Sequence, residues 1–212
     1  MKNHAFVGLF GSGKTEIALN FALKLASDGE NVAIADLDYV SPYFRTRDKI
    51  GELERMGIKV LVPPGKYIHA DTPIIPPEVF GYLSNPNYST VLDVGGEEDG
   101  IAVLGYLRPF LKKTAIYMVV NTRRPFSRRV EEILKTYEKL SRRARTDFQY
   151  LVSNTNLGPE TTCEIVREGE EILSRVSKIL EIPVAFTVVP SFLDCETQFE
   201  KFVIERKLAL EW

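Results

Sequence analysis

Two glycines, a lysine and a threonine near the start of the chain are spaced as a phosphate-binding loop requires. Residues 8–15 read GLFGSGKT, which matches the pattern G-x-x-x-x-G-K-T. Glycines allow the backbone to curl closely around an anion and to point its N–H groups at it. Lys14 is then expected to reach the β- and γ-phosphates of a nucleotide, and the Thr15 hydroxyl to bind Mg²⁺. The residues of this segment that are predicted to bind the nucleotide are Gly8, Gly11, Ser12, Gly13, Lys14, Thr15 and Glu16.

The segments on either side of this loop predict the structural context that it needs. Residues 4–7 are short and apolar, as expected for a buried strand. Apolar side chains recur at helical spacing from Ile17 to Ala26, and Asp28 with Gly29 is typical of a helix end. A helix that begins directly after the loop would add partial positive charge to an anion site. Strand, glycine loop and helix together favour phosphate binding over an ordinary glycine-rich turn.

The second predicted strand ends in carboxylates. Asp36 and Asp38 follow the apolar residues 32–35. In a parallel sheet, ligands bind at the carboxyl ends of the strands, so this end should lie beside the phosphate loop. We expect Asp38 to act with Lys14 in catalysis by orienting a water molecule. Asp36 is a candidate for the magnesium side of the site, together with Thr15.

A later strand end carries the second set of candidate residues. Asp93 follows the apolar residues 90–92 and is followed by Val94, Gly95 and Gly96. An apolar strand that ends in Asp typically supplies the carboxylate on the magnesium side of a phosphate loop. Gly96 would place a backbone N–H where it can sense the γ-phosphate. Aspartates at strand ends are also common as turn formers, so the assignment depends on the phosphate loop.

Strand-like and helix-like segments alternate along the whole chain. The alternation predicts an α/β fold of three layers, in which a mostly parallel β-sheet carries helices on both faces. The expected strands are residues 4–7, 32–35, 58–62, 90–92, 115–120, 148–152 and 183–189, and the expected helices are residues 48–56, 78–83, 127–145 and 160–180. Residues 62–88 are rich in proline and are predicted to be an irregular excursion. Since no linker or repeat indicates a second domain, we expect residues 1–212 to form a single nucleotide-binding domain.

Composition indicates an ordinary globular protein. Hydrophobic residues make up 44% of the 212 residues and charged residues 26%, with a net charge of −2, so no basic field attracts nucleic acid. No apolar run approaches the roughly 18 residues of a membrane span, and no secretion signal precedes the glycine loop. Cys163 and Cys195 stand apart without a C-x-x-C pair, and they are expected to be free thiols in a reducing environment. These features predict a cytoplasmic protein.

In combination, these motifs resemble those of the MinD/ParA-type nucleotide-binding proteins, a group that includes the nitrogenase iron protein. The resemblance is carried by the loop, the D-L-D of residues 36–38, the D-V-G-G of residues 93–96 and Asn154, in order along nearly the whole chain. It implies ATP or ADP and Mg²⁺ as ligands, Asp38 as the residue that polarises the attacking water, and Asp93 on the magnesium side.

The same resemblance suggests how the base is recognised. It implies that Asn154 binds the adenine edge, which is chemically reasonable because an amide offers a donor and an acceptor together. The guanine-reading pattern N/T-K-x-D is absent from residues 153–157, which read SNTNL. The sequence therefore favours ATP over GTP, with a turn residue as the alternative role of Asn154.

One departure from the family pattern bears on catalysis. MinD/ParA-type loops have a second lysine that reaches across a dimer, but the matching position here is Leu9, followed by Phe10. A homodimer of the family type is therefore doubtful, and slow hydrolysis is expected. Arg45 and Arg47 follow Asp38 and are candidates to supply positive charge to the transferring phosphoryl group, although arginines there are more often solvated or salt-bridged.

Two further regions attract attention. Basic side chains are frequent between Arg123 and Arg145, but glutamates offset them, so a solvated helix face is expected rather than a surface for an acidic partner or nucleic acid. The tail, residues 196–212, mixes apolar and charged side chains and is expected to form a last helix docked on the sheet, or a protein interface. It lacks the basic excess of a membrane-binding helix.

The function most consistent with the sequence is that of a slow Mg²⁺-dependent ATPase that acts as a switch on a protein partner. The main alternative is a small-molecule kinase or ATP-dependent ligase of the dethiobiotin synthetase kind, in which residues 62–88 form an acceptor pocket. A third reading is a binding module that holds nucleotide with negligible turnover, consistent with the missing loop lysine.

Overall fold

The computed structural model describes residues 2–38, 50–62, 75–96 and 98–208, without the side chains of residues 98 and 99. Arg45 and Arg47, together with most of the proline-rich excursion, lie outside these ranges. The predictions made for those residues therefore stay predictions.

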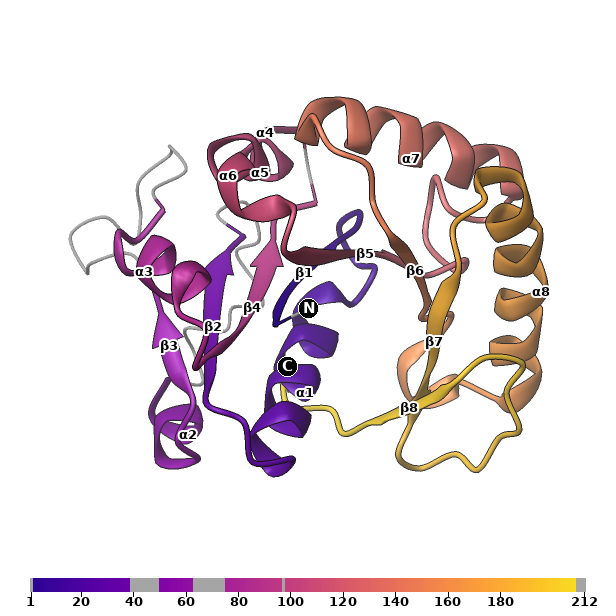
Figure 1. Cartoon of the computed structure of the whole chain (residues 1–212). Coiled ribbons are helices and arrows are strands. Elements are labelled where there is room, and N and C mark those ends of the chain that lie inside the picture. The colour runs from indigo at the N-terminus through magenta and orange to yellow at the C-terminus, as the bar shows by residue number, and fades with distance from the viewer. Residues whose placement is uncertain (1, 39–49, 63–74, 97, 209–212) are drawn as a thin grey trace.

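Eight strands form one sheet in the order β3-β2-β4-β1-β5-β6-β7-β8, and each neighbouring pair is parallel. The strands are β1 (Asn3–Val7), β2 (Val32–Leu37), β3 (Lys59–Leu61), β4 (Ser89–Val94), β5 (Thr114–Val120), β6 (Tyr150–Ser153), β7 (Val184–Pro190) and β8 (Lys201–Ile204). In the sheet, β1 lies between β4 and β5, so the carboxyl end of β1 lies between the carboxyl ends of these two strands (Figure 1).

Helices cover both faces of this sheet. One face carries α1 (Lys14–Ser27) and α2 (Ile50–Arg55). The other face carries α3 (Glu78–Ser84), α4 (Glu98–Ile101), α5 (Val103–Tyr106), α6 (Arg108–Leu111), α7 (Val130–Ala144) and α8 (Cys163–Leu180). This arrangement confirms the predicted three-layer α/β fold. Within the described ranges, no helix is both long enough and apolar enough to span a membrane.

Side-chain alternation along the strands divides the core into two layers. In β1, Phe6 packs under α1, whereas its neighbours Ala5 and Val7 face the layer of α3 to α8. Strands alternate in this way because successive side chains point to opposite faces. All three residues are fully buried, so β1 is a rigid base for the loop that follows it.

Two strands are longer than the sequence predicted, and the difference matters for the site. The strands β2 and β4 extend beyond the predicted apolar runs, so Asp36 and Asp93 lie within strands and face each other in the β2–β4 register. Asp38 is the first residue after β2. The prediction from hydrophobicity ended these strands too early. A buried carboxylate interrupts the run of apolar residues, but it does not interrupt the backbone pairing between the strands.

The tail forms a strand, not the expected helix. Residues 201–204 pair with β7, and within them Phe202 is buried whereas Lys201 and Val203 are exposed. This alternation is typical of an edge strand and is short enough to be obscured by the charged residues around it. The prediction of a last helix was therefore wrong for the described part of the tail.

The expectation of two free cysteines was also wrong. Cys163 and Cys195 form a disulfide across a sequence separation of 32 residues. The absence of a C-x-x-C pair did not exclude this bond, because β7 and the loop that follows it bring the two residues together at the first turn of α8. The cysteine argument for a reducing environment therefore no longer holds.

Candidate functional site

The loop between β1 and α1 has the geometry of an anion site. Gly13 adopts a left-handed conformation with φ 88° and caps α1, and no side chain caps the helix. A Cβ atom at Gly13 would lie 2.3 Å from Nδ2 of Asn154, so both its conformation and its surroundings require glycine. The uncapped N–H groups of the first turn then face the loop, where an anion is favoured by hydrogen bonding and by the helix dipole.

The end of β4 lies directly against the start of this loop. A Cβ atom at Gly96 would lie 1.9 Å from the carbonyl oxygen of Gly8. Such a close approach of two backbones is open only to glycine. The structure thus brings Gly96 to the phosphate loop, where the sequence had predicted it.

Lys14 and Asp38 form a buried ion pair. Their Nζ and Oδ2 atoms are 2.6 Å apart, and the exposed fractions of the two side chains are 6% and 4%. Burial alone would lower the pKa of Lys14, but the nearby charges of Asp93, Asp38 and Asp36 outweigh it and raise that pKa above its usual value. Lys14 therefore stays positively charged, and the carboxylates at the ends of β2 and β4 stabilise that charge at the loop.

Asp93 is fully buried, and among the described residues neither of its carboxylate oxygens has a hydrogen bond of ordinary geometry, so the nearby Thr15 hydroxyl has only a small effect on it. Burial, with the charges of Asp38 and Asp36, raises its pKa to about 7, while Lys14 and the Thr15 hydroxyl act in the opposite direction. A buried carboxylate without a partner is costly and is expected to have one when the site is in use. The loop contains a second buried polar group without a hydrogen-bond partner among the described residues, the Oγ of Ser12.

These groups fit a magnesium ion. Three buried carboxylates, Asp36, Asp38 and Asp93, lie close enough to act on the charge of Lys14, so among the described residues negative charge is in excess there. The described part of the chain contains no group of three or more His, Cys, Asp or Glu placed to hold a metal ion by itself. Magnesium does not require one, because it is commonly bound by one or two carboxylates, water and the phosphates of the substrate.

Asn154 lies against the phosphate loop rather than away from it. Its Nδ2 donates to the carbonyl oxygen of Ser12 at 2.6 Å, and its Oδ1 accepts from Nδ2 of Asn156 at 3.2 Å. The side chain is 4% exposed. Asn154 therefore joins the end of β6 to the loop, and the role in base recognition implied by the resemblance stays a prediction.

A cavity of about 670 Å³ opens beside the loop. Its lining comes from the phosphate loop with the start of α1 and from four segments distant in sequence, namely residues 124–125, 154–159, 190–192 and 204–208. Lys14 and Thr15 lie at the loop side, whereas Pro159 and Phe192 belong to the other segments. The volume falls within the range typical of small-molecule sites.

Two arginines of this cavity were missed by the sequence analysis. Arg124 was counted with the solvated basic segment, yet a Cβ atom at Gly11 would lie 3.3 Å from its Nε. Arg206, from the tail, also lines the cavity. Neither belongs to a recognisable motif, so only the assembled structure assigns them to the site.

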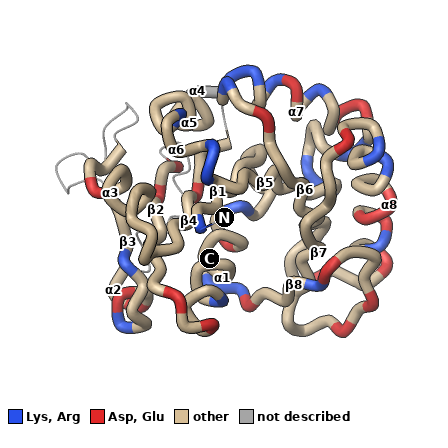
Figure 2. Tube along the Cα trace, in the orientation of Figure 1, with Lys and Arg blue, Asp and Glu red and all other residues tan. Residues whose placement is uncertain are grey.

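The rest of the basic segment includes α7 and residues beside it. Lys, Arg and Glu side chains are interspersed along α7, as the alternating blue and red of Figure 2 show. Arg123 is paired with Glu168 of α8. Whether this face is simply solvated or meets a partner stays a prediction.

Comparisons with known proteins support the fold class. No protein-family model matches the sequence, and no curated protein matches it either. The structure is similar to that of chloroplast FtsY from Physcomitrella patens, with a TM-score of 0.61 at 13% identity over 87% of this chain and 57% of that one. For FtsY from Thermotoga maritima, the TM-score is 0.57 at 17% identity, over 88% and 61% of the two chains.

A third similar structure, the signal recognition particle receptor FtsY from Elizabethkingia anophelis, was determined in complex with GDP. Its TM-score is 0.58 at 16% identity, over 88% of this chain and 57% of that one. This chain thus spans less than two thirds of the length of the three FtsY chains. The sheet, the loop and these likenesses define the class: the chain has the α/β fold of P-loop nucleotide-binding proteins. They do not single out the MinD/ParA branch.

Proposed function

We propose that this protein binds ATP with Mg²⁺ and hydrolyses it slowly, as a switch of the MinD/ParA type that acts on a protein partner. The observation that supports this most is the group of Lys14, Asp38 and Asp93, buried beside an uncapped helix N-terminus. Three carboxylates and one lysine at such a site suit a ligand that brings both phosphate groups and a divalent cation.

Each residue has a distinct task in this proposal. The backbone N–H groups of the loop and the ammonium of Lys14 bind the phosphates. Asp38 orients a water molecule towards the γ-phosphorus, and the bond from that phosphorus to the bridging oxygen breaks, which releases ADP and phosphate. Thr15, Asp93 and Asp36 would hold magnesium, which supplies positive charge to the phosphates when bound.

Slow turnover follows from the charges available at the loop. Leu9 is apolar and cannot stabilise the negative charge that develops on the transferring phosphoryl group. We expect a rate below about 1 per second, the lower end of ordinary enzyme turnover. Arg124 packs on Gly11 and is the described cation best placed to assist once a partner orders the site.

The base and the cellular setting belong to the same proposal. ATP is preferred over GTP because the guanine-reading pattern is absent after β6, where residues 153–157 read SNTNL. A separate protein partner is proposed rather than a second copy of the chain, because Leu9 stands at the position of the cross-dimer lysine. We place this activity in the cytoplasm, where ATP and Mg²⁺ are supplied.

The test is phosphate release from ATP by the purified protein and by the Asp38→Asn variant. Wild type should release phosphate slowly without any acceptor, and Asp38→Asn should lose this turnover while still binding ATP. Asp28→Asn, which changes an exposed carboxylate at the other end of α1, is the matched control and should behave as wild type. Phosphate transfer that occurs only with an added acceptor would favour the alternative function of a small-molecule kinase or ligase. Full activity of Asp38→Asn would show that Asp38 does not have the role proposed for it.

A further inference from the structure

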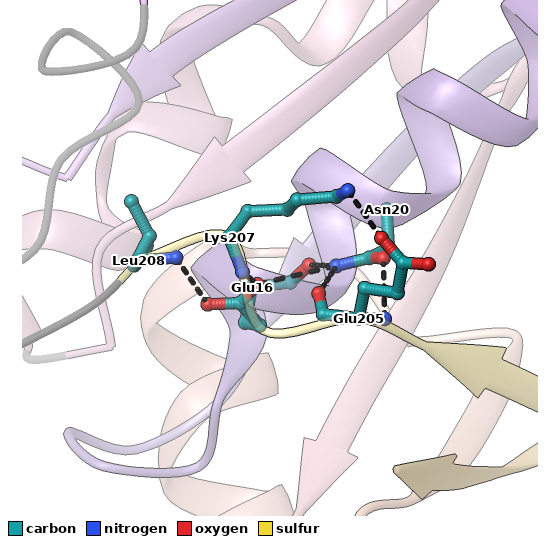
Figure 3. A network of polar contacts seen from close by, with 5 residues as sticks. All are labelled: Glu16, Asn20, Glu205, Lys207 and Leu208. Atoms are coloured by element: carbon teal, nitrogen blue, oxygen red, sulfur yellow. Dashed lines mark hydrogen bonds and ion pairs between the residues drawn. The ribbon is translucent and has the colours of Figure 1, made fainter. Parts of the chain in front are cut away.

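The carboxylate of Glu16 is engaged by the tail of the chain. Its Oε2 accepts a hydrogen bond from the backbone N–H of Leu208 at 3.1 Å, and its Oε1 accepts one from the N–H of Lys207 (Figure 3). Glu16 directly follows Thr15 in the first turn of α1. The sequence predicted that Glu16 binds nucleotide, and this stays a prediction: Glu16 lines the cavity, while its carboxylate is bound by a segment about 190 residues further along the chain.

Asn20, one turn further along α1, binds the same segment in both directions. Its Oδ1 accepts from the N–H of Glu205 at 3.1 Å, and its Nδ2 donates to the carbonyl oxygen of Glu205 at 3.0 Å. Nδ2 also lies 3.2 Å from Oε1 of Glu16, so the two side chains support each other. Figure 3 shows these residues as one network between α1 and the tail.

The segment held in this way forms one wall of the cavity. Ile204, Arg206 and Leu208 line the cavity, in alternation with Glu205 and Lys207, whose backbone N–H groups bind α1. Leu208 does both, because its backbone N–H also donates to Glu16. Leu208 is also buried against the core beneath α1, which adds an apolar anchor at the end of the wall.

We propose that Glu16 and Asn20 are positioning residues that hold residues 204–208 as the wall against which the nucleoside half of a nucleotide packs. The inference rests on the proposed nucleotide-binding function and deepens it. Phosphate recognition depends on the loop, whereas nucleoside recognition depends on a tail segment whose position is set by the residue next to Thr15. Arg206 and Leu208 supply the charged and apolar contacts of that wall.

The test compares two probes by titration calorimetry in the presence of Mg²⁺. ADP carries a nucleoside and pyrophosphate does not. We expect Glu16→Ala to weaken ADP binding at least tenfold and to change pyrophosphate binding by less than twofold. Glu16→Gln keeps one acceptor and should recover part of the loss. Asp28→Ala, which removes an exposed carboxylate from the same helix, is the matched control and should leave both affinities unchanged.

A second variant guards against a folding defect. Arg206 is exposed and lines the cavity from the wall itself, so Arg206→Ala should fold normally and weaken ADP but not pyrophosphate. If Glu16→Ala or Arg206→Ala binds ADP as wild type does, or if pyrophosphate is weakened as much as ADP, the inference is wrong. If wild type binds neither probe, the proposed function fails, and the inference fails with it.

Discussion

The two halves of the cavity are built in different ways. The phosphate half is a contiguous stretch, residues 8–15, whose glycines and lysine are positioned by the strand before it and the helix after it. The other half, to which we assign the nucleoside and which we call the nucleoside half, is lined by residues 124–125, 154–159, 190–192 and 204–208, each from a different part of the chain. A contiguous site can be recognised from residue types and spacing, whereas an assembled site depends on long-range contacts that hold its segments together.

Three sets of long-range contacts hold the segments of the nucleoside half together. The disulfide ties the loop after β7 to the start of α8. Glu170 of α8 is buried, and its Oε1 accepts hydrogen bonds from Thr187 Oγ1 at 2.5 Å and from the backbone N–H of Gln198 at 2.9 Å, which holds the return from β7 to β8. Glu16 and Asn20 hold the tail. The nucleoside half should therefore be the more fragile of the two.

The largest effect is expected from removing the disulfide. Closing a loop across 32 residues restricts the unfolded chain, so Cys163→Ser with Cys195→Ser should lower the free energy of unfolding by about 3 kcal/mol. ADP binding should weaken while pyrophosphate binding persists, because the bond supports only the nucleoside half. Urea unfolding and calorimetry measure the two effects. Unfolding at the same urea concentration as wild type, with unchanged ADP binding, would show that the two halves are equally robust.

Acid should lower the stability of the whole described domain, through the central strand β1 that precedes the phosphate loop. Burial, and then the charge of the chain's N-terminal ammonium, lower the pKa of His4 in β1 from 6.5 to about 4, with Glu30 acting in the opposite direction. Between these values the unfolded chain binds a proton that the folded chain does not, so stability falls as the pH falls. The loss should be at most about 3 kcal/mol and should be smaller in His4→Gln. The raised pKa of Asp93 acts in the opposite direction over the same pH range. The readout is therefore the difference between wild type and His4→Gln in urea unfolding at pH 7 and pH 4.5, and an equal pH dependence of the two proteins would contradict the assignment.

The smallest of these effects concerns the junction between the halves. Asn154→Ala removes the hydrogen bond to the carbonyl oxygen of Ser12, which costs about 1 kcal/mol for a buried contact. Pyrophosphate and ADP binding should both weaken by about fivefold, because the loop itself is loosened. Competition between ATP and GTP provides the second readout. If pyrophosphate binding is unchanged and the preference for ATP disappears, Asn154 reads the base and does not support the loop.

The fold class and the phosphate half could be predicted from the sequence because both depend on local patterns. Alternating strand and helix segments indicated a parallel sheet, and the spacing from Gly8 to Thr15 indicated the loop. Asp38 and Asp93 were predicted at strand ends, and the structure brings both to Lys14. What the sequence did not predict is that Asp38 pairs with Lys14, since an ion pair between two distant residues leaves no pattern.

The nucleoside half could not be predicted for the same physical reason. Glu16 was predicted to bind the nucleotide, and nothing in the sequence indicated that the backbone N–H groups of Lys207 and Leu208 bind its carboxylate. The tail was expected to be helical, because β8 is too short to stand out from the charges beside it. Arg124 and Arg206 look like ordinary surface residues until the sheet places them at one cavity.

The central claim is that residues 8–15 bind the phosphates of a nucleotide, and Lys14→Ala tests it most directly. Titration of ATP and of pyrophosphate, each with Mg²⁺, should show at least tenfold weaker binding to the variant, or about 1.4 kcal/mol. Both ligands should be affected equally, because Lys14 belongs to the phosphate half. Lys24→Ala, at the exposed end of the same helix, should bind as wild type does. Equal affinity of wild type and Lys14→Ala for ATP would contradict the account.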